Sequence, residues 1–87
     1  MRLWVARLHI SARTEAKIRG RHGLDPFEIR EHIECRRTLD GRQYDDPARG
    51  RQYIVKVTVG SQRIVAVLYA SRHGAEDEFD LASAYLI

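Results

Sequence analysis

Two apolar stretches joined by a tight turn constrain the fold of this chain more than any other feature. β-Branched and aromatic residues recur at every second position from Tyr53 to Val59, which is the period of a β-strand. Gly60-Ser61 suits a two-residue type II′ turn. The chain then returns through Arg63–Ser71, whose nearly continuous apolar sequence predicts a strand in the centre of a sheet. The middle of the chain therefore predicts an antiparallel β-hairpin.

Local signals predict the other strands. Leu3–Ile10 alternates with period two and predicts a strand that is buried mainly through the Trp4 face. Phe79–Ile87 predicts the last strand by the same alternation. Arg36–Asp40 is ambiguous between a short strand and a connection. Gly41–Gly50 is expected to be a loop, because glycine, aspartate and proline interrupt it repeatedly.

Two helices are expected between the first strand and the hairpin. Ser11 can cap a helix over residues 12–22, and Gly23 suits the left-handed position that follows a helix. A second start signal comes directly afterwards, where Asp25 can accept a hydrogen bond from the Glu28 amide.

The second helix is expected to run from Pro26 to about Cys35, with Pro26 at a position that needs no amide hydrogen. Only a few residues separate the two helices, so they are expected to form a helical hairpin. The predicted fold is a single α+β domain over residues 1–87 with the order β-α-α-β-β-β. Its antiparallel sheet carries the N-terminal helical hairpin on one face.

Composition excludes several classes of protein. Hydrophobic residues make up 44% and charged residues 31% of the 87 residues, as in ordinary globular domains. The longest apolar run, Ile64–Ala70, is far shorter than the roughly 20 residues of a membrane helix. Cys35 is the single cysteine and is expected to be a small buried residue, so no internal disulfide is expected. We expect a cytoplasmic protein.

No cofactor or metal site is expected. The chain has no glycine-rich phosphate loop and no cysteine pair. The four histidines lack the spacing of a metal site on one face of a helix: His9, His22, His32 and His73.

Charge is distributed unevenly along the chain. The formal net charge is +3, and the acidic residues Glu76, Asp77, Glu78 and Asp80 lie after the last basic residue, Arg72. Residues 1–72 hold all fifteen Lys and Arg but only eight Asp and Glu, a formal charge of +7. A basic body of this kind indicates a polyanion or an acidic protein as partner.

The order of elements, together with this basic charge, resembles the RelE/ParE superfamily of small bacterial toxins. Within that superfamily the sequence is most similar to BrnT-like toxins, over most of the chain. The segments that carry the resemblance are Glu15–Ile18 and Arg21–Leu24 at the end of the first helix, Asp25–Ile29 at the start of the second, Arg51–Ser71 in the hairpin and Ala82–Ala84 in the last strand.

The resemblance implies a toxin of a type II toxin–antitoxin pair. Such a toxin cleaves mRNA, free or on the ribosome, without a metal, and is neutralised by a cognate antitoxin. The implied assembly is a homodimer or a hetero-oligomer with that antitoxin. Cleavage needs a base for the 2′-hydroxyl, cations for the phosphorane and an acid for the leaving oxygen. The candidate catalytic residues are Arg63, Tyr85, His22 and Arg51, and the candidates for binding RNA are Arg13, Lys17, Arg21, Tyr53 and Arg72.

Two departures from the family pattern support a second interpretation. Tyr85 stands where the family has an arginine after Ser-Ala, and the sequence ends at Ile87 before the family's terminal helix. A non-catalytic module that binds RNA or protein through the same basic face also accounts for the charge. Ordinary structural roles are available as well, since a helix C-terminus favours a cation such as His22 and a hairpin tolerates a solvated Arg63.

Overall fold

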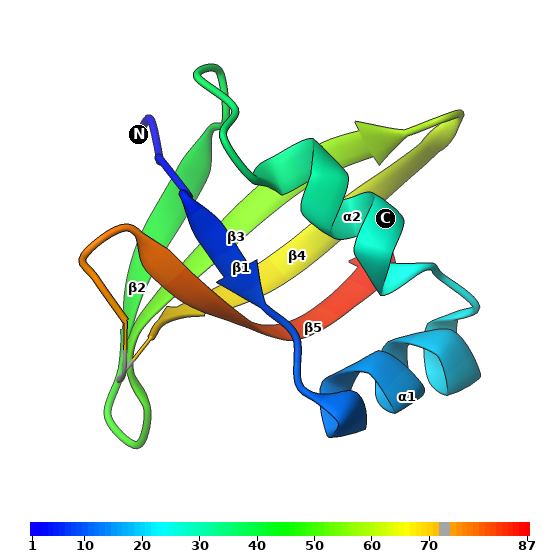
Figure 1. Cartoon of the computed structure of the whole chain (residues 1–87), viewed down its shortest axis with the longest axis horizontal. Helices are drawn as coiled ribbons and strands as arrows, with labels where there is room; N and C mark the ends of the chain where they lie inside the picture. The colour runs from blue at the N-terminus through cyan, green and yellow to red at the C-terminus, as the bar shows by residue number, and fades with distance from the viewer. Residues whose placement is uncertain (72–73) are drawn as a thin grey trace.

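The computed structural model describes residues 1–71 and 74–87 (Figure 1). The chain forms an α+β domain with the order β-α-α-β-β-β-β. Its elements are β1 (Arg7–His9), α1 (Ala12–His22), α2 (Pro26–Ile33), β2 (Gly41–Asp46), β3 (Gly50–Val59), β4 (Gln62–Ala70) and β5 (Glu78–Leu86).

All five strands belong to one sheet, in the order β1-β5-β4-β3-β2. The predicted hairpin is β3 and β4, and β4 has the expected central position. Gly60 at its turn has a φ of 62°, the left-handed conformation that a type II′ turn requires at its first central residue. The expected antiparallel pairing is confirmed except at one edge, where the short strand β1 runs parallel to β5.

The N-terminal strand is shorter than its alternation predicts, and its buried face is different. Only Arg7–His9 pairs as a strand. The side chains of Leu3, Val5 and Leu8 are buried, whereas that of Trp4 is 45% exposed, so burial through the Trp4 face is wrong. The spacing from Val5 to Leu8 breaks period two because the backbone leaves the strand conformation between these residues.

The segment 41–50 is not a loop: Gly41–Asp46 forms the edge strand β2. Most of its side chains are exposed, so the strand lacks the apolar alternation by which the others were predicted. Three of the residues that indicated a loop lie within the strand: Gly41, Asp45 and Asp46. Only Pro47 and Gly50 lie at the turn that follows, where Gly50 has a φ of 88°. A left-handed glycine after a three-residue connection is a common way to close a hairpin.

Local hydrogen bonds explain why both helices start where they do. The Ser11 hydroxyl accepts from the Thr14 amide at 3.1 Å, which confirms the predicted cap of α1. Asp25 caps α2, but its carboxylate accepts from the Phe27 amide at 3.0 Å instead of the predicted Glu28 amide. Both amides lack a partner within the helix, so either bond serves the same purpose.

The core lies between the two helices and one face of the sheet. Ile18 from α1 and Ile29 and Ile33 from α2 are fully buried against Val55 and Leu68 of the sheet. In Figure 1, α2 crosses in front of the sheet and α1 lies beside the end of β5. Within residues 1–71 and 74–87, no helix is long and apolar enough to span a membrane.

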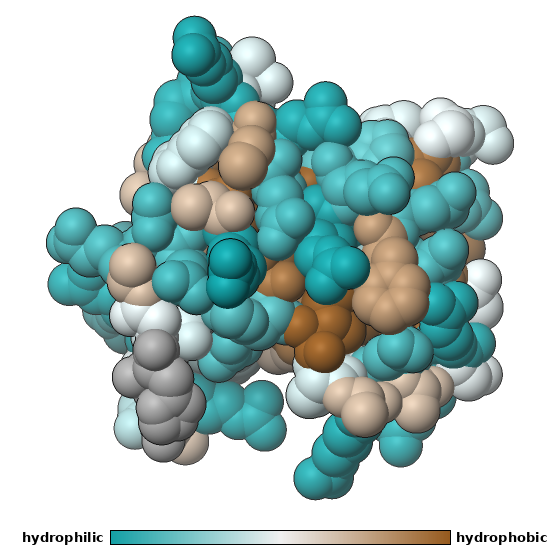
Figure 2. Space-filling view, in the orientation of Figure 1, coloured by the Kyte–Doolittle hydropathy of each residue, from teal (hydrophilic) through white to brown (hydrophobic). Residues whose placement is uncertain are grey.

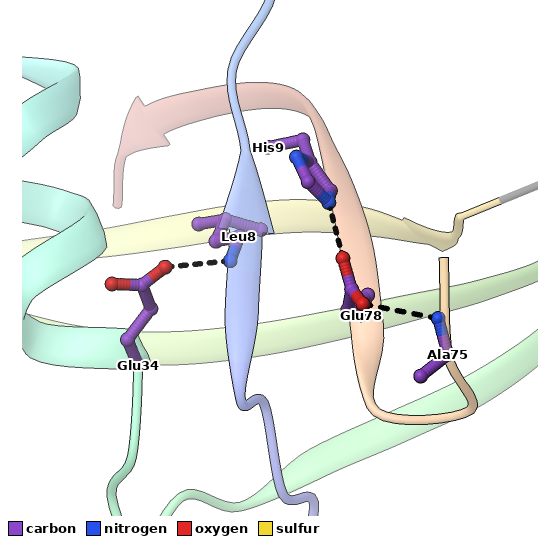
Figure 3. A network of polar contacts seen from close by, with 5 residues as sticks. All are labelled: Leu8, His9, Glu34, Ala75 and Glu78. Carbon is purple, nitrogen blue, oxygen red and sulfur yellow. Dashed lines mark hydrogen bonds and ion pairs between the residues drawn. The ribbon is translucent and has the colours of Figure 1, made fainter. Parts of the chain in front are cut away.

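Side-chain carboxylates anchor the short strand β1 on both sides (Figure 3). The Leu8 amide donates to the Glu34 carboxylate at 2.7 Å, which joins β1 to the end of α2. His9 Nε2 lies 2.7 Å from Glu78 Oε1, and the other carboxylate oxygen of Glu78 accepts from the Ala75 amide at 3.1 Å. Because three paired residues give little stability to a strand, these bonds help to fix its position.

Candidate nucleic-acid interface

The sheet has one buried face and one open face. Along β4, Ile64, Ala66 and Leu68 belong to the core. Successive side chains of a strand point to opposite faces, so Arg63 and Tyr69 lie on the other side. We call that side the open face.

Helix α1 runs beside the outer edge of β5, beyond the three residues that pair with β1. The Lys17 ammonium donates to the Ala82 carbonyl at 2.7 Å. Further along, the ring centroids of His22 and Tyr85 are 6.3 Å apart. Because Ile18 is buried in the core, the neighbouring side of α1, which carries Lys17, lies along the edge of β5.

A groove beside α1 collects cations from two distant parts of the sequence. Arg13, Lys17 and Arg21 recur at every fourth position of α1, and Arg49 comes from the turn between β2 and β3. We call this the cationic groove; its volume is about 630 Å³, and it is lined by Arg13, Thr14, Ala16, Lys17, Arg21, Arg49 and Ala82. Every charged residue of its lining is positive, so it suits an anion.

Arg49 is held at the groove by a hydrogen-bonded turn. Its guanidinium carbon lies 5.7 Å from the centroid of the Tyr69 ring, within the range of a cation–π interaction. The Tyr69 hydroxyl donates to Asp46 at 3.1 Å and accepts from the Gln52 amide at 2.8 Å. Asp46 also accepts from the Ala48 amide at 2.9 Å.

The hydrogen bonds of this turn keep the Asp46 carboxyl ionised. The hydrogen bond from the Ala48 amide lowers the pKa of the Asp46 carboxyl, and the Tyr69 hydroxyl and the nearby Arg49 charge lower it further. The carboxylate therefore stays ionised at neutral pH and holds the turn that presents Arg49.

The four cations of the groove are free of carboxylate partners within the described residues. None of them lies within 4.0 Å of an Asp or Glu oxygen among residues 1–71 and 74–87. Arg19, on the same helix, instead contacts both Glu15 and Asp25. A ligand phosphate in the groove would therefore not have to displace an internal ion pair.

Beyond the groove, three of the four candidate catalytic residues lie near one another. His22 ends α1, and the Tyr85 side chain, 41% exposed, lies beside it. Tyr85 pairs with Val65, so Arg63, two residues before Val65, points to the same open face. The structure therefore brings His22, Tyr85 and Arg63 to one end of the open face.

Two candidates lie away from this surface. Tyr53 is buried in the core, where its ring meets the Phe79 ring edge-on at 5.2 Å, so it is not available to stack on a base. Arg51 pairs with Asp45 near the start of β3, whereas Arg63 pairs with Thr58 near its end. Arg51 therefore does not join the other catalytic candidates.

Arg72 lies outside the described residues. The groove residue that sequence reasoning missed is Arg49. The segment taken for a loop, 41–50, holds two Arg and two Asp and has no net charge, so the sequence contains no signal for Arg49. Arg49 reaches the groove only because strand β2 forms and closes the turn.

A second hollow lies on the side of the domain that carries α2. Figure 2 shows an apolar patch there within a hydrophilic surface. This hollow is lined by Arg7, Leu8, His9, Ile10, Ser11, Thr14, Arg30, Glu34, Asp80 and Leu81. Because the lining contains both basic and acidic residues, it does not favour an anion as the cationic groove does. Within the described part of the chain, no group of three potential metal ligands comes together.

Comparison with known proteins identifies no family for this chain. No protein-family model, no curated protein and no solved structure matches the chain. The chain is therefore defined by its architecture, a small α+β domain with two N-terminal helices and a five-stranded, mostly antiparallel sheet.

Proposed function

We propose that this domain binds RNA, with the sugar–phosphate backbone lying in the cationic groove. The observation that carries the proposal is the convergence of Arg13, Lys17 and Arg21 with Arg49, without an acidic residue in the lining. Arginine suits this role because its planar guanidinium can bind two phosphate oxygens at once. The resemblance to RelE/ParE toxins supports RNA as the polyanion.

An exposed tyrosine ring near the groove, with a half-buried histidine beside it, favours an unpaired strand. Tyr85 and the histidine beside it offer aromatic surface at one end of the groove. Bases of a single strand stack on such surfaces, each contributing about 1–3 kcal/mol to binding. A duplex keeps its bases stacked on one another and offers only its backbone.

The test is the affinity for a fluorescently labelled single-stranded RNA, measured by anisotropy. Arg13→Ala combined with Arg21→Ala should weaken binding at least about tenfold, because each substitution removes a phosphate contact. Arg2→Ala combined with Arg37→Ala is the matched control, since both arginines are exposed, lie outside the groove and change the net charge equally. Equal losses from both pairs would reject the groove as the binding site.

A second candidate function is cleavage of the bound RNA, as in the toxins that the sequence resembles. The proximity of His22 and Tyr85 favours it, because one group can accept the proton of the 2′-hydroxyl. The 2′-oxygen then attacks phosphorus, the bond to the 5′-oxygen breaks, and the other group protonates that oxygen. Arg63, on the same face, would stabilise the charge of the phosphorane.

Cleavage is tested separately from binding. His22→Ala and Tyr85→Phe should each reduce the cleavage rate at saturating RNA by about 10²-fold or more, as expected for loss of a general acid or base. An RNA with 2′-O-methyl groups should bind but stay intact. Binding without cleavage by the unmodified chain would reject this candidate and leave the RNA-binding proposal standing.

The partner implied by the same resemblance is an antitoxin. A basic domain of this kind suits an acidic protein that covers the groove and competes with RNA. Co-expression of the neighbouring reading frame, followed by co-purification, tests this partner. Growth arrest caused by the chain alone and relieved by that neighbour would support a toxin–antitoxin pair; growth unchanged by the chain would contradict it.

A further inference from the structure

The two edges of the sheet are closed to different degrees. The outer edge of β5 is covered first by β1 and then by α1, whose Lys17 binds the Ala82 carbonyl. At the opposite edge, β2 has β3 on its inner side. On its outer side, the described residues supply only the N-terminal residues, which bond to Gly41 and bridge Asp40.

The contacts of Gly41 show which main-chain groups of β2 point outward. Its amide donates to the Met1 carbonyl at 2.9 Å, and its carbonyl accepts from the Met1 amino group at 3.0 Å. Both groups therefore point away from β3. Because this direction alternates along an antiparallel strand, the amides and carbonyls of Gln43 and Asp45 also point outward. Unpaired groups of this kind are a template for another strand.

We propose that two copies of this chain associate through β2, in an antiparallel pair with Tyr44 at the two-fold axis. In this register Gln43 of each copy lies opposite Asp45 of the other, and the four outward-pointing residues exchange main-chain hydrogen bonds. The next pair of outward-pointing residues would be Gly41 of one copy and Pro47 of the other. The main-chain bonding stops there, because Pro47 has no amide hydrogen and Gly41 is already bonded to Met1.

Charge complementarity favours a second copy as the occupant. The same register places Arg42 of each copy directly opposite Asp46 of the other, twice across the axis. Among the described residues Arg42 has no carboxylate within 4.0 Å. Tyr44, now 49% exposed, would meet its own symmetry mate. An isologous contact of this kind closes after two copies and does not propagate into a fibre.

Disulfide trapping tests the register directly. Tyr44→Cys, with Cys35→Ser to remove the native thiol, should form a covalent dimer on mild oxidation. At a non-hydrogen-bonded pair the two Cα atoms are about 4.5 Å apart, within disulfide range. Asp45→Cys in the same background is the matched control, since its symmetry mate lies diagonally, at about 7–8 Å. Equal trapping at both positions would overturn the proposed register.

Sedimentation velocity tests the association without a cross-link. The unmodified chain should show a monomer–dimer equilibrium that shifts with concentration. Gln43→Pro removes an outward amide hydrogen and should weaken the dimer at least about tenfold. Arg42→Asp should weaken it similarly, whereas Arg37→Asp, with the same charge change outside β2, should not. A chain that stays monomeric at all concentrations would overturn the proposal and leave the edge to a strand of another protein.

Discussion

At the scale of single residues, Cys35 shows how a connection can impose an unfavourable backbone conformation. Its φ of 56° makes it the one non-glycine residue with positive φ among residues 1–71 and 74–87. Its side chain is exposed and not buried as expected. Its amide donates to the Val5 carbonyl at 2.8 Å, so the end of α2 is tied to the N-terminal segment through a strained residue.

Replacement of this residue by glycine should therefore stabilise the fold. Cys35→Gly relieves the left-handed strain and should raise the free energy of unfolding by roughly 0.5–1 kcal/mol, after the entropy that glycine costs. Denaturant titration measures the change. Cys35→Ala keeps a β-carbon and serves as control, so equal stability of the two variants would contradict the strain argument.

A second residue-scale prediction concerns Glu78. The Ala75 amide and then His9 lower the pKa of the Glu78 carboxyl from its ordinary value of 4.5. The unfolded chain therefore takes up this proton at a higher pH than the folded chain does. The stabilisation is fully present above about pH 4.5 and is lost as the pH falls through the lower, folded pKa.

Glu78→Gln should flatten the pH dependence of stability in this acidic range, because no carboxylate is left to titrate. Unfolding by denaturant at several pH values between about 3 and 6 measures the slope. Glu76→Gln, on the same turn, is the control. The prediction fails if both variants keep the slope of the unmodified chain.

At the scale of elements, apolar periodicity predicted those strands that have a buried face. Tyr53–Val59 is recognised by its alternation and the return strand by its nearly continuous apolar sequence, because both strands face the core. Strand β2 could not be found in this way, since it is held by the ladder of β3 and has exposed side chains. Strand β2 forms because β3 offers main-chain hydrogen bonds to it, and the residues of β2 themselves carry no pattern that indicates this pairing.

The candidate site was predictable only where one element contains it. The basic residues of α1 follow from helical spacing alone. Arg49 and the contact of His22 with Tyr85 depend on how α1 packs against the last strand. Tyr53 shows the opposite case, because the alternation that identified its strand also placed its ring in the core.

The contact between α1 and β5 gives an element-scale prediction. Lys17→Met keeps the length of the side chain but leaves the Ala82 carbonyl without its donor, which should cost about 1 kcal/mol of unfolding free energy. Arg13→Met, one turn earlier, should change stability by less than about 0.5 kcal/mol. Thermal unfolding of both variants measures the difference, and equal losses would contradict a specific role for Lys17.

At the scale of the whole molecule, the apolar core lies between the helices and the sheet, and the basic side chains lie on the surface. Residues 1–72 carry the excess of arginine, and the fold gathers part of that excess along α1 and the β2–β3 turn. The proposed pairing through β2 would place two such grooves on the same side of one continuous sheet, because its two-fold axis is perpendicular to the sheet. A longer RNA could then contact both grooves at once.

The central claim is that the groove neutralises phosphates, and the salt dependence of RNA affinity measures this most directly. If Arg13 and Arg21 each contact one phosphate of a single strand, replacing both by alanine should reduce the slope of log K against log salt by about 1.4. The control pair Arg2→Ala and Arg37→Ala should leave the slope unchanged. A slope that is the same in all three proteins would contradict the account.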